Sequence, residues 1–160
     1  MQSFECRSIM VYYLWTFSDF VFALGNYYYG SVRNTTELMD TTTWRWTEKA
    51  SYPFEEVIYY AQSIYHNYSF YVFGGWDYNS SYHCLSRIAS FHVTTNTWAS
   101  RGQLGTRRYG AGVIWSDEVF LVVGGWMSGN TKTTEKCRFN DEDQIECQYQ
   151  TPSQPYCKFP

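Results

Sequence analysis

Apolar runs that end in glycine recur at a constant spacing along this chain of 160 residues. The runs align without gaps and cover residues 20–25, 70–75 and 120–125. Their last glycines, 50 residues apart, are Gly25, Gly75 and Gly125. Each run has the length and apolar content of a β-strand, and glycine is a common strand end. Because self-similarity at this period is typical of propellers and solenoids, the sequence predicts a repeat protein.

Turn-forming residues divide each repeat into four short strands. In the second repeat, the expected strands are residues 60–66, 69–74, 87–93 and 97–100. Four short strands per unit favour a propeller over a solenoid, and no long helical period competes with them. We therefore predict an all-β fold for residues 7–150, followed by an irregular tail at 151–160. The three expected four-stranded units are about 7–50, 57–102 and 107–150.

The repeats resemble the kelch family in their glycines and tryptophans. The second repeat carries Gly74 and Gly75 and, 23 residues after Gly75, Trp98. The third repeat carries Arg108-Tyr109-Gly110, an apolar strand, and then Gly124 and Gly125. In the first, Trp46 follows the single Gly25 by 21 residues, whereas the matching phase of the third, near residues 145 and 146, has no tryptophan. The resemblance implies kelch-like propeller blades. We expect the glycines to end a strand and the tryptophans to pack between adjacent blades.

Three units are too few for a closed propeller, which has four to eight blades. Three blades alone would leave exposed faces and unpaired strand edges. We therefore expect that this chain does not close a ring by itself. It is expected to be part of a longer protein, with assembly of two copies into one ring as the alternative.

Two of the five cysteines flank a natural hairpin turn at residues 140–144. Antiparallel pairing would place Cys137 and Cys147 opposite each other, with their β-carbons about 4.5–5.5 Å apart, which is near disulfide reach. A disulfide is the preferred reading, and two reduced, packed thiols are the alternative. An odd cysteine count leaves at least one thiol unpaired within the chain. Neither the cysteines nor the three histidines show metal-ligand spacing, so no metal is predicted.

Three N-glycosylation sequons begin at positions expected to lie in loops, namely Asn34, Asn67 and Asn79. Together with the cysteine pair, they favour an extracellular, secreted glycoprotein. A cytoplasmic location is the alternative.

Aromatic residues follow the glycine in each repeat, where we expect a loop. A shared phase would bring them to one face of neighbouring units, and tyrosine and tryptophan on loops are typical anchors of protein interfaces. The alternative is that they pack between units. The candidate binding residues are Tyr27, Tyr28, Tyr29, Trp76, Tyr78, Trp126 and Met127.

Composition and missing signatures exclude several function classes. A formal net charge of -3 argues against nucleic acid as the main partner. The sequence contains no run of eighteen apolar residues, so no membrane-spanning helix is predicted. Nucleophile-elbow and phosphate-loop signatures are absent, and no recognisable ligand set matches the copper site of the galactose oxidases, whose propellers are similar. No cofactor is predicted.

We therefore expect a non-enzymatic protein-interaction module whose partner the sequence does not identify. Self-association is a further expectation if the chain is complete. The alternative function is the substrate-recognition propeller of an intracellular BTB-type ubiquitin-ligase adaptor, with its BTB region outside this chain.

Overall fold

The computed structural model describes residues 10–11, 14–17, 19–28, 31–55, 58–77, 84–127 and 133–150. For residues 10–11, 14–17, 26–28 and 31–33, it describes the backbone alone. All regular secondary structure in these ranges is β-strand, which confirms the predicted all-β class. Accordingly, this part of the chain contains no helix long and apolar enough to cross a membrane.

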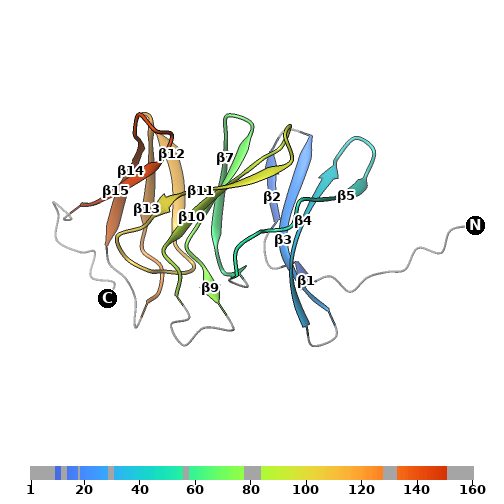
Figure 1. The fold of residues 1–160 in the computed structure, drawn as a ribbon, viewed down its shortest axis with the longest axis horizontal. Helices are drawn as coiled ribbons and strands as arrows, with labels where there is room; N and C mark the ends of the chain where they lie inside the picture. Colours follow the sequence, from blue (N-terminus) through green and yellow to red (C-terminus); the bar gives the residue numbers. More distant parts are fainter. Residues whose placement is uncertain are drawn as a thin grey trace, which may run out of the picture.

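Three antiparallel meanders of four strands lie side by side, running from right to left in Figure 1. Unit 1 consists of β2 (Leu14–Phe17), β3 (Phe20–Tyr28), β4 (Ser31–Asp40) and β5 (Arg45–Lys49). Unit 2 consists of β7 (Gln62–His66), β8 (Ser69–Phe73), β10 (Arg87–His92) and β11 (Thr97–Gln103). Unit 3 consists of β12 (Gly112–Ser116), β13 (Val119–Val123), β14 (Thr134–Phe139) and β15 (Ile145–Gln150).

Short strands tie the units to the segments around them. β1 (Met10–Val11) pairs with the end of β3, and β6 (Ile58–Tyr59) pairs with β9 (Trp76–Asp77). Units 2 and 3 join into one sheet through a short parallel contact between β11 and β15. There Gly102 has φ 133°, and a β-carbon on it would lie 2.4 Å from the carbonyl oxygen of Ile145. Only glycine permits this close approach of the two backbones.

The two-residue turn between the first and second strands of each unit defines how the three repeats align. The residues that precede these turns are Phe17, His66 and Ser116. The spacing is therefore 49 and then 50 residues, so that Gly25 corresponds to Gly74 and Gly124. These three glycines share a left-handed backbone, with φ of 75°, 58° and 66°. The predicted alignment of Gly25 with Gly75 was wrong by one residue because the first repeat is one residue shorter between turns.

The single glycine of unit 1 does not end its strand, in contrast to the prediction. β3 continues past Gly25 to Tyr28, with a register shift at the glycine that is typical of a bulge. In units 2 and 3, a second glycine turns the strand away, and a β-carbon on Gly75 would lie 3.0 Å from the carbonyl oxygen of Tyr59. Gly125 stands equally close to the corresponding carbonyl, at 2.9 Å. One glycine thus bends the strand, whereas two end it.

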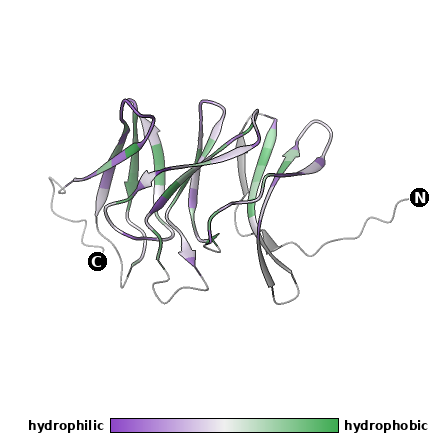
Figure 2. Cartoon of the chain, viewed as in Figure 1, coloured by the Kyte–Doolittle hydropathy of each residue, from purple (hydrophilic) through white to green (hydrophobic). Residues whose placement is uncertain are grey.

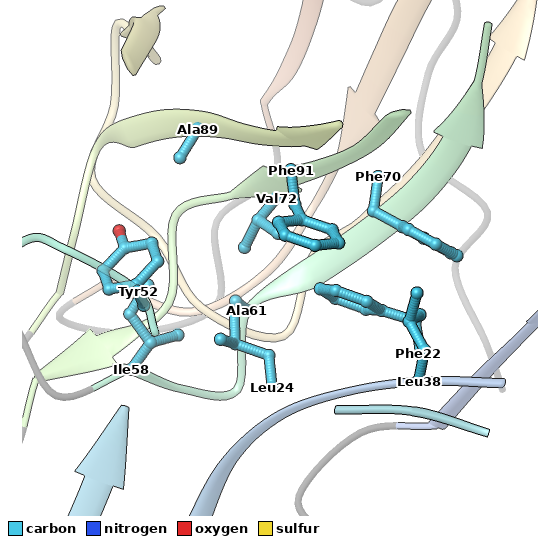
Figure 3. Packing of buried hydrophobic residues seen from close by; sticks show 10 residues of the cluster. All are labelled: Phe22, Leu24, Leu38, Tyr52, Ile58, Ala61, Phe70, Val72, Ala89 and Phe91. Carbon is cyan, nitrogen blue, oxygen red and sulfur yellow. The ribbon is translucent and has the colours of Figure 1, made fainter. Parts of the chain in front are cut away.

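The core consists of two apolar layers, one between each pair of adjacent units. Figure 3 shows the layer between units 1 and 2, where Phe22 stacks on Phe70 with ring centroids 4.2 Å apart. The second layer holds Tyr71 and Phe73 of unit 2 against Phe120 of unit 3. Successive residues of β8 thus face opposite neighbours, as the alternation of a strand requires. In Figure 2, apolar colour follows the strands between the units, whereas polar colour marks many of the turns.

The tryptophans of units 1 and 2 hold corresponding positions in different surroundings. Trp98 packs between units 1 and 2, where its indole N–H lies 3.2 Å from Thr36 Oγ1 and 2.9 Å from the carbonyl oxygen of Ala50. Trp46 lies on β5 and is 42 % exposed. The predicted packing of Trp46 between two units is absent from the described structure, because its face of unit 1 points away from unit 2. The corresponding position in unit 3 belongs to Cys147, not to residue 145 or 146.

Candidate functional site

An aromatic residue follows the glycine turn of β8 and β13, at the end of the units where β9 lies (Figure 1). In unit 1, the aromatic residue two positions after Gly25 lies within β3. In all three units, the aromatic residue at this position pairs with the segment that precedes the unit. The three pairs are Met10–Tyr27, Tyr59–Trp76 and Tyr109–Trp126. Their common pairing places Tyr27, Trp76 and Trp126 at corresponding backbone positions.

Ring contacts join these aromatic residues across units 2 and 3. The ring of Trp76 meets that of Tyr109 edge-on, with centroids 5.0 Å apart, and Tyr60 lies 5.7 Å from the same ring. Tyr60, Trp126 and Met127 are 47 %, 43 % and 43 % exposed. We name this group of five residues the aromatic end surface: Tyr60, Trp76, Tyr109, Trp126 and Met127.

Arg108 fixes the backbone next to Tyr109. Its side chain is fully buried and forms an ion pair with the equally buried Glu135. The guanidinium also donates to the carbonyl oxygens of Gly124 at 2.8 Å and Thr133 at 3.1 Å, and to Thr133 Oγ1 at 2.9 Å. Glu135 accepts two further backbone N–H groups from the loop before Arg108, at 2.6 and 3.0 Å. Because these buried charges are paired and hydrogen-bonded, the segment that carries Tyr109 is held rigidly.

Cys84 contacts two residues of the aromatic end surface, Trp76 and Trp126. Its half-buried thiol lies 3.7 Å from the carbonyl oxygen of Trp126, and its backbone bridges to Trp76. Burial raises the pKa of this thiol. The group is therefore protonated at neutral pH, which makes it a poor nucleophile and a weak hydrogen-bond donor.

The predicted binding residues divide into three groups. Trp76, Trp126 and Met127 belong to the aromatic end surface. Trp76 lies in the short strand β9, so its predicted place in a loop was wrong, because it pairs with β6. Tyr27 and Tyr28 lie in β3, so their predicted place in a loop was wrong, because Gly25 forms a bulge instead of ending the strand. Tyr29 and Tyr78 lie outside the described residues.

Sequence reasoning did not include Tyr60 and Tyr109 among the candidate binding residues. Tyr109 shares its repeat phase with Tyr59, and this recurrence was the available signal. A residue that recurs just before the first strand of a unit is positioned to pair with the residue that follows the glycine turn, as Tyr59 and Tyr109 do.

The predicted disulfide between Cys137 and Cys147 is present. The two residues are direct partners in the β14–β15 register, with Cα atoms 4.0 Å apart. Among the described residues, Glu135, Cys137 and Cys147 have potential metal-ligand atoms that lie within 4.8 Å of one another. The sulfurs are bonded to each other and the carboxylate is bonded to Arg108, so the group is not free to hold a metal ion in this state.

The sequons have different surroundings. Asn67 occupies the exposed turn between β7 and β8, as predicted for a loop residue. Asn34 lies in β4, and its amide nitrogen donates to the carbonyl oxygen of Phe54 at 3.3 Å. Its predicted loop position was wrong because the polar segment around it pairs with the extended β3. Asn79 lies outside the described residues.

Two of the three histidines lie in the described structure, and each has a structural contact. The ring of His66 lies 4.0 Å from that of Trp115 at the junction of units 2 and 3, and burial lowers its pKa. His92 Nδ1 accepts a hydrogen bond from the backbone N–H of Thr95 at 3.2 Å, inside a turn. These contacts assign packing and turn roles to the two rings.

Comparison with known proteins finds similarity at the level of fold. No protein-family model and no curated protein matches the chain. A solved structure described as "Structure of YjhT" superposes with a TM-score of 0.70 at 16 % sequence identity. The match covers 89 % of this chain and 52 % of that chain, so this chain spans about half the length of its structural neighbour. At this identity, the likeness concerns the fold alone.

Proposed function

We propose that the three units are kelch-like blades of a β-propeller and that the chain serves as a non-enzymatic protein-interaction module outside the cell. The antiparallel four-stranded units, the recurring glycines and the packing of Trp98 between units support the kelch-like assignment. The match covers only 52 % of the solved structure, which supports a propeller of more than three units.

The observation that carries the functional proposal is the aromatic end surface. Exposed aromatic and methionine side chains of this size are common anchors of protein interfaces, since they bury much apolar area and lose little conformational entropy. Tyr109 directly follows Arg108 of the buried ion pair, and Trp126 and Met127 follow Gly124, whose carbonyl oxygen accepts a hydrogen bond from the same guanidinium. A rigid platform of this kind lowers the entropic cost of binding.

The extracellular location rests on the disulfide and on one exposed sequon. Disulfides persist in oxidising compartments and are rare in the cytosol. Asn67 lies in an exposed turn at the opposite end of unit 2, where a glycan would leave the aromatic end surface accessible.

A binding screen with matched variants tests the proposal. The immobilised chain is screened against an array of extracellular proteins, beside a variant with Tyr60, Trp126 and Met127 all replaced by serine. The control replaces the exposed Tyr68 and Glu118, at the opposite end, by serine. We expect binders that the control retains and the triple variant loses. Binders held equally by both variants would contradict the assigned surface.

A further inference from the structure

Two cysteines and a glutamate meet where unit 3 packs on unit 2. Glu135 and Cys137 are two residues apart on β14, so their side chains point to the same face of the strand. Cys147 is the direct partner of Cys137 on β15. The ligand atoms of the three residues lie within 4.8 Å of one another, while the two sulfurs are bonded to each other. Reduction of that bond would leave three donor atoms of a metal site side by side.

The sheet, and not only the disulfide, sets the placement of the two sulfurs. β14 and β15 pair over six successive residue pairs, and the side-chain oxygen of Asn140 closes the turn between them by accepting from the backbone N–H groups of Glu142 and Gln144. On its other side, β14 pairs with β13. Direct cross-strand partners have β-carbons about 4.5–5.5 Å apart with or without a covalent bond. The two thiols of a reduced chain therefore stay opposite each other.

A zinc ion fits the spacing of these three residues. Tetrahedral Zn–S bonds of about 2.3 Å hold two sulfurs about 3.8 Å apart, and a Zn–O bond of about 2.0–2.2 Å holds the oxygen about 3.6 Å from each sulfur. The ligand atoms already lie within 4.8 Å, so side-chain movements of about 1 Å complete the geometry. Thiolates select zinc over calcium and magnesium, which take oxygen ligands. Because the cysteines are 10 residues apart in the chain, the strand register and not a short sequence motif brings them together.

The carboxylate of Glu135 has an acceptor position left for a metal ion. Its Oε1 accepts from Arg108 and from the backbone N–H of Thr106 at 3.0 Å, whereas Oε2 accepts from the backbone N–H of Gly105 at 2.6 Å. A carboxylate offers about four acceptor positions, so one position on Oε2 is left among the contacts of the described residues. The three existing bonds fix the carboxylate in place, as outer contacts orient a metal ligand.

The balance of buried charge also requires a divalent ion beside two thiolates. In the oxidised chain, the fully buried side chains of Arg108 and Glu135 neutralise each other. Two thiolates would add two negative charges, and buried charges without a partner are costly. A single Zn²⁺ offsets both thiolates, so that zinc, arginine, the two thiolates and the carboxylate sum to zero.

The site is accessible through one of its sulfurs. Cys137 and Glu135 are fully buried, whereas Cys147 is half-buried at the edge of the apolar layer. A small reductant can reach the disulfide at the sulfur of Cys147. The same opening admits the zinc ion and a water molecule as its fourth ligand.

We propose that reduction of the disulfide converts this junction into a zinc site with Cys137, Cys147 and Glu135 as its protein ligands. The reductant is a small thiol, whose thiolate attacks the sulfur of Cys147 and releases Cys137. A second thiol molecule attacks the mixed disulfide, releases Cys147 and leaves with the first as their disulfide. The two protein sulfurs thereby gain two electrons and two protons, and Zn²⁺ then displaces both protons to the solvent. The disulfide and the zinc ion are alternative ways to link the same two residues.

Zinc binding by the oxidised and the reduced chain tests the proposal. The purified chain is reduced with a phosphine, desalted without oxygen and titrated with Zn²⁺ against a chromophoric chelator. We expect one ion per reduced chain with release of about two protons, and no such binding by the oxidised chain. Cys137→Ser or Cys147→Ser should lower the affinity at least about 100-fold, since even an outer contact of a metal ligand is worth about 10- to 100-fold. The control combines Cys6→Ser, Cys84→Ser and Cys157→Ser and should leave zinc binding unchanged.

Two variants that differ only in the charge of residue 135 test the carboxylate. Arg108→Met leaves Glu135 without its cation, so the reduced variant should bind zinc more tightly than the unchanged chain. Arg108→Met with Glu135→Gln removes the anionic ligand, and its affinity should fall about tenfold or more below that of Arg108→Met. X-ray absorption at the zinc edge of the unchanged reduced chain counts the ligands without any variant. We expect two sulfurs at about 2.3 Å, with oxygens at about 2.0–2.2 Å.

Several results would overturn the proposal. These are equal zinc binding by the oxidised and reduced chains, full affinity in either cysteine variant, equal affinities of the two Arg108 variants, a sulfur count other than two, or a reduced chain that zinc leaves unfolded. Circular dichroism reports the fold of each chain. If a variant is unfolded, the sulfur count and the comparison of the oxidised with the reduced chain decide the outcome.

Discussion

The two interfaces between units use the same backbone positions and different chemistry. On the face of unit 2 that packs on unit 1, Phe91 pairs across strands with Trp98. On the face of unit 3 that packs on unit 2, the corresponding pair is the disulfide of Cys137 and Cys147. The backbone of the repeat therefore fixes where two residues meet, while aromatic packing and a covalent bond are alternative ways to hold them.

A second pair of positions shows the same contrast. Ile58 and Ala89 belong to the apolar layer between units 1 and 2. By register, their counterparts in unit 3 are Arg108 and Glu135, which form a buried ion pair. A buried ion pair replaces an apolar pair without loss only where additional hydrogen bonds satisfy both charges. Here the carbonyl and hydroxyl groups around Arg108 supply them.

Breaking the ion pair should have the largest effect. Arg108→Met leaves the carboxylate of Glu135 buried without a cation and should cost about 3–5 kcal/mol of the free energy of unfolding. Denaturant titration of the purified chain measures the loss. The double change Arg108→Met with Glu135→Gln removes both charges and keeps an oxygen acceptor, so it should recover most of the stability. Equal losses in the two variants would refute the role of the buried charge.

The aromatic pair of the other interface should follow. Trp98→Ala opens a cavity between units 1 and 2 and removes two hydrogen bonds, which should cost about 3 kcal/mol. Trp44→Ala is the control, since it is 74 % exposed and should change stability by less than about 0.5 kcal/mol. Thermal melting and denaturant titration both report the difference. A similar loss in the two variants would mean that the packing of Trp98 is not what stabilises this interface.

Removal of the disulfide should cost somewhat less. Cys137→Ser with Cys147→Ser frees a short loop, since the cysteines are 10 residues apart, and the gain in unfolded-state entropy is about 2–3 kcal/mol. Cys84→Ser is the control, because Cys84 forms no disulfide and its replacement removes no covalent bond. Mass spectrometry of the protein from an oxidising and a reducing expression compartment shows whether the bond forms. Stability that is unaffected by the double change would contradict the structural role of the bond.

The smallest expected effect is a pH dependence of the free energy of unfolding that arises from His66, at the interface of units 2 and 3. Burial lowers the pKa of His66 below its ordinary value of 6.5. The unfolded chain then takes up a proton at a higher pH than the folded chain. Stability from this group is complete above pH 6.5 and falls as the pH drops toward the folded pKa. His66→Phe keeps an aromatic ring beside Trp115 and should abolish this part of the pH dependence of the urea midpoint. An unchanged pH profile in His66→Phe would exclude His66 as its source.

The features that could be predicted were local in the chain. The second strand of unit 2 was expected at 69–74 and is Ser69–Phe73. The disulfide could be inferred because its cysteines flank a single hairpin, so neighbouring residues alone decide their register. The corresponding positions of Trp76 and Trp126 could be predicted because both residues directly follow glycine turns, and whether they bind a partner stays a prediction.

The errors arose where a decision depended on contacts between strands. The alignment of Gly25 was wrong by one residue because the spacing of glycines does not reveal that the first repeat is one residue shorter between turns. Tyr28 was placed in a loop because Gly25 was expected to end the strand, whereas the strand continues past a bulge and Tyr28 pairs in β3. Asn34 lies in a polar segment and was therefore expected in a loop. The segment instead forms β4, because it pairs with β3.

Periodicity and local backbone preference were enough to predict the repeat, the all-β class and the hairpin that pairs Cys137 with Cys147. Tertiary structure alone decided which face of each strand meets which neighbour. It brought Arg108 to Glu135 and left Trp46 exposed while Trp98 became enclosed. Burial and ion pairing depend on how the units pack against one another. Two tryptophans at corresponding positions therefore differ in exposure, because only Trp98 faces another unit among the described residues.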